Sequence, residues 1–117
     1  HPTSMDELLA KLGASPVEWN CKTVCCGGGL TLCDPDGVAQ MSHRILKNAL
    51  DSGANCVVVA CPMCQVNLDM KQADAKKLGL AADVPIFYLT DLVGMALGLK
   101  PSQLDVHRHF TQTKLSK

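Results

Sequence analysis

The sequence "CVVVACPMCQ", residues 56–65, gives the clearest indication of the fold class. Residues 56–60 are apolar and β-branched without a polar alternation, which is typical of a strand covered on both faces, as in a parallel sheet. Pro62 is a preferred first residue of a helix. A buried strand followed at once by a helix indicates an α/β fold, and it places Cys61 and Cys64 at the junction of the two elements.

The flanking sequence repeats this alternation. Residues 22–26 and 84–89 have strand composition. Capping residues, apolar spacings of three and four, and terminating glycines or prolines predict four helices, at residues 4–12, 34–53, 62–79 and 90–99. Ser4 and Glu7 form a capping pair for the first helix, and Asp34 with Pro35 starts the second. Thr90 or Asp91 caps the last.

The inward faces follow from the same spacings. In the second helix these residues are Val38, Met41, Ile45 and Ala49. In the third they are Val66, Met70 and Ala73, with Gly79 at its end.

Strands alternating with helices predict an α/β domain with a small parallel sheet flanked by helices. Cys25 and Cys26 would end the first strand and Cys61 the second. Because the carboxyl ends of parallel strands share one edge, the cysteines should gather at the C-terminal edge of the strands. At 117 residues, we expect residues 1–117 to form a single cysteine-rich domain.

Composition excludes several classes of function. The 11 basic residues balance 11 acidic ones and only four residues are aromatic, so a nucleic-acid surface is not expected. No apolar run is long enough to cross a bilayer, and the start of the chain lacks the layout of a signal peptide. We therefore expect a cytoplasmic protein without direct membrane insertion. Seven cysteines then indicate metal binding or redox chemistry rather than a disulfide framework.

Four of the cysteines form the candidate site: Cys25, Cys26, Cys61 and Cys64. Two pairs at one sheet edge are hard to reach by chance, and adjacent cysteines fit a shared multinuclear centre better than a disulfide with each other. The Cys-x-x-Cys pair alone would also suit a dithiol oxidoreductase, which would leave "CCGGG", residues 25–29, unexplained. Cys33 and Cys56 are interpreted as packing residues, and Cys21 stays open as a ligand.

The other polar candidates receive no role. His43 is expected to be an ordinary residue of its helix, and His107 and His109 belong to a polar exit from the last helix. Asp69 and Asp91 have no partner visible from spacing. The methionines Met41 and Met70 are interpreted as core packing.

Taken together, "CCGGGL", "GVAQMSHRIL" and "VVVACPMCQVNLDMKQ" resemble the cysteine-rich CCG domain found in the B subunit of heterodisulfide reductase and its relatives, over nearly the whole chain. The resemblance implies that Cys25, Cys26, Cys61 and Cys64 bind a non-cubane [4Fe-4S] cluster. It further implies electron transfer and reductive cleavage of a disulfide, CoM-S-S-CoB or an analogue. The implied partners are a preceding N-terminal CCG domain, an iron–sulfur protein like the C subunit of that enzyme and a flavin protein like its A subunit.

The chain departs from the family pattern at one point. The family motif has a further cysteine several dozen residues before the CC pair, whereas Cys21 is the sole cysteine before Cys25 here. Since the chain also begins with His1, we expect a C-terminal piece of a longer subunit, inactive alone and either metal-free or holding Zn²⁺ on four thiolates. A structural zinc or assembly module and a metal-free dithiol protein using Cys61 and Cys64 are the alternatives.

Overall fold

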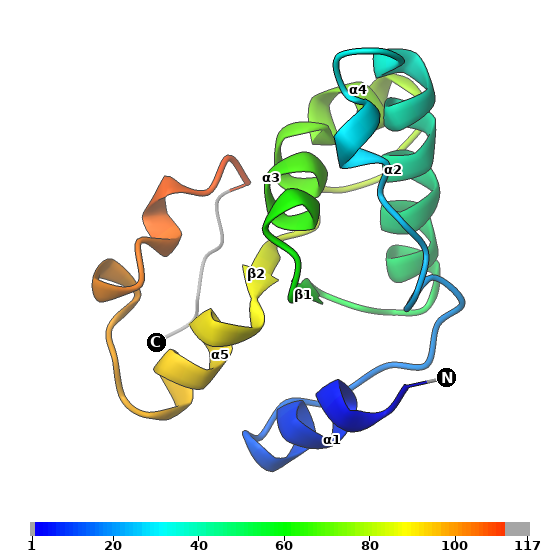
Figure 1. Ribbon diagram of the computed structural model, residues 1–117. Helices are drawn as coiled ribbons and strands as arrows, with labels where there is room; N and C mark the ends of the chain where they lie inside the picture. Colours follow the sequence, from blue (N-terminus) through cyan, green and yellow to red (C-terminus); the bar gives the residue numbers. More distant parts are fainter. Residues whose placement is uncertain (1, 112–117) are drawn as a thin grey trace.

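The computed structural model describes residues 2–111 and has an α/β architecture (Figure 1). Five α-helices, three short 3₁₀ helices and two strands occur in this range. Their order is α1 (Ser4–Lys11), η1 (Gly28–Leu30), α2 (Pro35–Asp51), β1 (Val57–Val59), α3 (Pro62–Met70), α4 (Gln72–Lys77), β2 (Ile86–Tyr88), α5 (Leu89–Ala96), η2 (Pro101–Gln103) and η3 (Val106–Arg108). The predicted fold class, a small parallel sheet flanked by helices, is confirmed. Residues 1 and 112–117 of the predicted domain lie outside the described range.

The sheet consists of β1 and β2, which pair in parallel with Val57 opposite Ile86 and Val59 opposite Tyr88. The amide of Val57 also donates to the carbonyl of Pro85, at 2.9 Å, just ahead of the paired residues. Val57, Ile86 and Phe87 are buried. The consecutive buried residues Ile86 and Phe87 show that β2 is covered on both faces. In β1 only Val57 is buried and Val58 and Val59 are half-buried, so this strand is less covered than its composition predicts.

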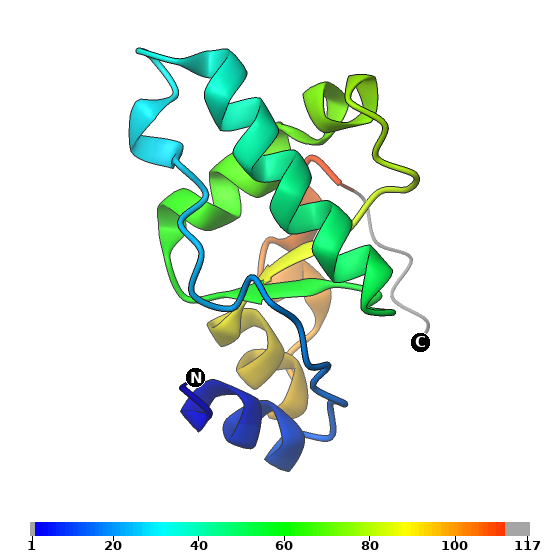
Figure 2. The same cartoon turned by 90° about the vertical axis from the view of Figure 1, so that its right-hand side faces the viewer.

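Helices cover both sides of this sheet. The long helix α2 crosses one side, where it packs against α3 and α4, and α5 with the η2 and η3 segment lies on the other side (Figures 1 and 2). The core between α2 and the sheet is built on buried side chains, among them Leu46, Ala49, Val84 and Ile86. No helix within residues 2–111 is long and apolar enough to span a membrane.

Most predicted helix ends are close to the observed ones. Asp34 caps α2 by accepting the amide hydrogen of Gly37 at 2.9 Å. Helix α1 starts at Ser4, so the N-cap is Thr3, one residue before the predicted cap, and the Thr3 hydroxyl donates to Glu7 at 2.8 Å. Helix α5 is capped at Tyr88, whose amide donates to Asp91 at 2.9 Å, and it ends at Ala96 rather than Leu99.

The predicted strand at residues 22–26 is wrong. The backbone turns at residues 20–23, and the amide of Val24 donates to the carbonyl of Cys21 at 3.2 Å. That bond closes a local turn in place of pairing with a strand. Cys25 and Cys26 therefore lie in a loop, not at a strand end.

The predicted helix at residues 62–79 is divided at Lys71 into α3 and α4. Its inward face is also predicted wrongly: Val66, Met70 and Ala73 are exposed. The buried residues are Gln65, Asn67, Leu68, Asp69, Gln72 and Ala75. Polar side chains face inward here because several of them satisfy backbone groups of neighbouring loops, which have no strand or helix partner.

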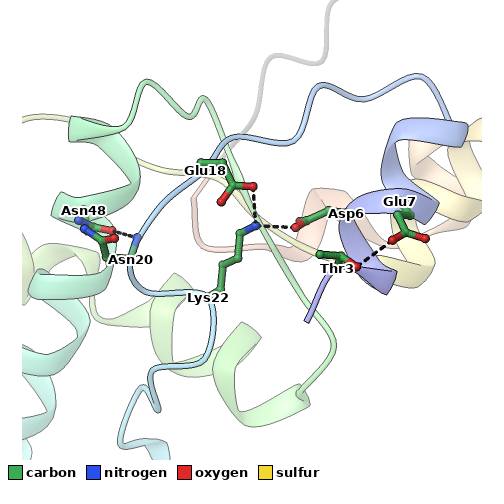
Figure 3. Close-up of polar contacts among 7 residues, drawn as sticks. All are labelled: Thr3, Asp6, Glu7, Glu18, Asn20, Lys22 and Asn48. Atoms are coloured by element: carbon green, nitrogen blue, oxygen red, sulfur yellow. Dashed lines mark hydrogen bonds and ion pairs between the residues drawn. The ribbon is translucent and has the colours of Figure 1, made fainter. Parts of the chain in front are cut away.

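The loop that leads to the cysteines is held by polar contacts at two places (Figure 3). The Lys22 ammonium contacts Asp6 of α1 at 2.5 Å and Glu18 at 3.1 Å. These two carboxylates, Asp6 first, raise the pKa of Lys22. The amide of Asn20 donates to the side chain of Asn48 in α2 at 3.0 Å. Residues 18–22 are thus fastened to α1 and α2, which directs the following residues towards α3.

Candidate functional site

Three of the four predicted site cysteines line one cavity. The cavity has a volume of about 250 Å³ and is bounded by β1, by the N-terminal part of α3 and by the loop before η1. The sulfur-bearing residues around it are Cys21, Cys26, Cys61 and Cys64. The two remote segments of the chain therefore meet, as the sequence predicts, although only Cys61 follows a strand directly.

Cys61 is exposed and forms the N-cap of α3. Amide hydrogens at the start of the helix, from Cys64 first and Met63 second, bond to its sulfur and lower the pKa of Cys61. This is the expected effect of unpaired helix N-terminal amides on a thiolate. Pro62 occupies the first helical position, where the N–H group that proline lacks would have no acceptor within the helix.

Cys64 has the opposite character. The pKa of Cys64 is raised to about 12. The largest cause is burial, the second is a hydrogen bond with the Cys26 side chain, and a bond with Cys61 adds to these. The Cys64 thiol thus lies between Cys26 on the loop and Cys61 at its own helix end. Cys61 is therefore the more easily ionised of the two thiols, and Cys64 the less easily ionised.

The glycines after Cys26 let the loop reach α3. Gly27 is left-handed, with φ of 74°, a conformation that side chains with a Cβ rarely adopt. Gly28 lies against α3 at ordinary contact distance: a Cβ there would lie 3.4 Å from the carbonyl oxygen of Met63 and 3.5 Å from the Cys26 sulfur. The predicted role of this glycine run therefore holds at Gly27, through its positive φ.

The remaining cysteines lie outside this contact. Cys25 is exposed, and its sulfur accepts the amide hydrogen of Gly27 at 3.4 Å, so it points along the loop instead of towards Cys64. Cys33 is exposed, which is not the placement of a packing residue. Cys56 is half-buried, and burial raises the pKa of the Cys56 thiol, in keeping with the predicted packing role.

Polar residues to which the sequence assigns no role hold this region together. The side-chain amide of Asn67 donates to the carbonyl of Cys26 at 3.0 Å and to the hydroxyl of Ser42 at 3.2 Å. Asp69 accepts from the amides of Phe110 at 2.7 Å and Thr111 at 2.8 Å. The one sequence signal for Asn67 is its spacing, one helical turn after Cys64.

The unassigned acids and histidines do not join the cysteines. Asp69 and Asp91 line a second cavity of about 310 Å³, together with His109 and Arg108, on the side of α3 that faces the η3 segment. His43 is partly buried in α2, and its Nε2 has no hydrogen-bond partner among the described residues.

The cysteine sulfurs around the cavity are chemically suitable ligands for a metal ion or a cluster. Soft sulfur ligands select zinc and iron–sulfur clusters, and N–H bonds to a ligating sulfur tune such sites. As the side chains lie, however, no three His, Cys, Asp or Glu residues within 2–111 converge tightly enough to hold one metal ion. Cys26, Cys61 and Cys64 would hold the group, and Cys25 would have to turn towards them.

Comparison with known proteins identifies the family of this chain. The cysteine-rich domain called CCG matches residues 1–69. The 8-methylmenaquinol:fumarate reductase membrane anchor subunit of Wolinella succinogenes is 36% identical over 117 residues, covering 98% of this chain and 41% of that protein. The B subunit of ferredoxin:CoB-CoM heterodisulfide reductase from Methanosarcina mazei is 34% identical over 116 residues, covering 95% of this chain and 38% of that protein.

The chain is thus an α/β domain in which a double-cysteine loop meets a Cys-x-x-Cys helix, and it is a cysteine-rich domain. The chain belongs to the CCG cysteine-rich domain family. It spans about two fifths of the length of the curated relatives it matches.

Proposed function

We propose that this chain is the cluster-binding domain of an oxidoreductase that resembles the B subunit of heterodisulfide reductase. The observation that carries the proposal is the meeting of Cys26 with Cys61 and Cys64 around one cavity. The family membership supports it, because related chains are named as subunits of heterodisulfide and fumarate reductases. In this proposal Cys25, Cys26, Cys61 and Cys64 bind a non-cubane [4Fe-4S] cluster.

When bound, such a cluster supplies single electrons to a substrate held beside it. The overall reaction is cleavage of a disulfide by two electrons and two protons, which yields two thiols. The chain's own contribution is to hold two thiols at the start of α3 and a third on the adjoining loop, and to present amide donors to the Cys61 sulfur. CoM-S-S-CoB or an analogue is the proposed substrate. The electrons come from two partners, an iron–sulfur protein of the C-subunit type and a flavin protein of the A-subunit type.

The test is anaerobic reconstitution of the intact subunit with iron and sulfide. We expect about four irons per site and an electron paramagnetic resonance signal that changes when a substrate thiol is added. Cys64→Ser should lose the signal. The matched control Cys56→Ser should keep it, since Cys56 does not line the cavity. An iron-free, signal-free protein under these conditions would reject the proposal.

A metal-free dithiol function is the second candidate, and one observation favours it. The lowered pKa of Cys61 beside the raised pKa of Cys64 matches a nucleophilic and a resolving thiol. In that case Cys26→Ser would leave disulfide exchange intact, whereas cluster binding would be lost with Cys26. A structural zinc module would instead show stoichiometric zinc after anaerobic purification and would lose helix content on addition of a chelator.

A further inference from the structure

Asn67 connects the two cysteine segments directly. It lies on α3, one turn after Cys64, and its side chain is buried. One of its amide hydrogens bonds to the Cys26 carbonyl at 3.0 Å, and the other bonds to the Ser42 hydroxyl at 3.2 Å. Three elements, the cysteine loop, α2 and α3, therefore meet at a single amide group.

The loop needs such a contact because it has no strand partner. Its backbone turns before Cys25, so no hydrogen bonds between strands fix the position of Cys26 along α3. Cys64 and Asn67 lie three residues apart on one rigid helix, on neighbouring positions of its surface. A bond from Asn67 to the Cys26 backbone thus sets where the Cys26 sulfur lies relative to Cys64.

The surroundings require the amide specifically. Both partners are reached by the two N–H donors of asparagine, and an aspartate would place a carboxylate oxygen against the Cys26 carbonyl. The loop lies against this part of α3: a Cβ on Gly28 would be at ordinary contact distance, 3.5 Å, from the Asn67 Cβ. A side chain one methylene longer would move the amide away from the position at which it reaches both the Cys26 carbonyl and the Ser42 hydroxyl.

We propose that Asn67 is a positioning residue that sets the spacing between Cys26 and the Cys61–Cys64 pair. The inference rests on the proposed function, since it assumes that these sulfurs bind one thiophilic group. It adds that α3, which carries Cys61 and Cys64, also fixes the position of Cys26. It does so through Asn67, which is not itself a ligand.

Gln72 offers a matched control on the next helix. It is also a buried side-chain amide, and it binds both backbone groups of a single residue: it donates to the Val84 carbonyl and accepts from the Val84 amide at 2.9 Å. Its bonds fasten α4 to the approach of β2, away from the cysteine cavity. Loss of Gln72 should therefore destabilise the fold without moving the cysteines.

The experiment is anaerobic titration of the reduced chain with Co²⁺, which absorbs through sulfur-to-cobalt charge transfer when thiolates bind it. We expect Asn67→Leu to weaken cobalt binding about 10-fold or more, the effect of removing a residue that orients metal ligands. Gln72→Leu should lose comparable stability in urea but bind cobalt like the unchanged chain. Equal cobalt affinity for Asn67→Leu and Gln72→Leu would overturn the inference.

Two further outcomes keep the test decisive. If Asn67→Leu does not fold, Asn67→Gln retains both donors one methylene further out and should also bind cobalt more weakly, and affinity equal to that of the unchanged chain would overturn the inference. If the unchanged chain shows no cobalt–thiolate absorption, the proposed ligand role of the cysteines fails and the inference fails with it. Normal binding by the unchanged chain with no effect at position 67 would overturn the inference alone.

Discussion

Two of the three consecutive glycines after Cys26, Gly27 and Gly29, should respond differently to substitution by alanine. Gly27 has φ of 74°, whereas Gly29 has no positive φ and a Cβ there would meet nothing within 4 Å. A left-handed conformation costs a residue with a Cβ roughly 1–2 kcal/mol. At a compatible position the change from glycine to alanine instead gains about 0.4–1 kcal/mol through the unfolded chain.

Gly27→Ala carries an additional contact. The new Cβ would lie 2.7 Å from the Met41 sulfur, which is well inside normal contact distance. The end of a methionine side chain is flexible and can move away, so most of the cost should come from the backbone. We therefore expect Gly27→Ala to lower the free energy of unfolding by about 1–2 kcal/mol and Gly29→Ala to leave it equal or slightly higher.

Urea unfolding of the reduced chain, followed by circular dichroism, measures both effects. Repeating Gly27→Ala in a Met41→Ala background separates the two causes, because only the steric part can be relieved there. The reasoning is refuted if Gly27→Ala and Gly29→Ala have the same unfolding midpoint, since the two positions would then be conformationally equivalent.

Three further predictions concern the site and its supports. Alkylation of Cys61 should reach half its maximal rate at a pH below the ordinary thiol pKa, because the lowered pKa of Cys61 lets its thiolate form at lower pH. Cys64 should react only at much higher pH, towards its pKa of about 12. Equal pH–rate profiles for the two cysteines, followed by mass spectrometry, would contradict this. Asp69→Ala should cost about 1–3 kcal/mol of stability and raise hydrogen exchange at residues 106–111, because two backbone amides lose their acceptor; unchanged exchange there would refute the anchoring role. Lys22→Met should raise hydrogen exchange of the backbone amides in α1 while leaving α2 protected, because the ion pair with Asp6 is lost. Unchanged protection of α1 would show that the ion pair does not stabilise this helix.

The sequence predicts the elements whose signals are local. Pro62 after an apolar run is sufficient to place a strand and a helix side by side, and Asp34 with Pro35 is sufficient to start α2. These signals depend on residues within one turn or one strand. The fold class follows from them. The meeting of the two cysteine segments is predicted through a strand at residues 22–26 that does not form, so that reasoning is wrong although the segments do meet.

Two features could not be predicted because they depend on contacts between distant residues. Residues 22–26 have strand composition, but a strand needs a partner, and the local turn at Cys21 leaves this segment beside α3 with none. The apolar spacing of Val66 and Met70 indicates the wrong face of α3, since Asn67 and Asp69 turn inward to bind loop backbones. A pattern of hydrophobicity does not register such polar anchors.

The most direct test of the central claim, that the loop and the helix bring their sulfurs together, is disulfide trapping. The reduced chain is treated briefly with a substoichiometric oxidant, quenched, digested and mapped by mass spectrometry. The contact between the two thiols predicts a Cys26–Cys64 crosslink as a leading product, with Cys33 and Cys56 unpaired. Crosslinks that join Cys26 to Cys33 or Cys56 while Cys64 stays free would contradict the shared site.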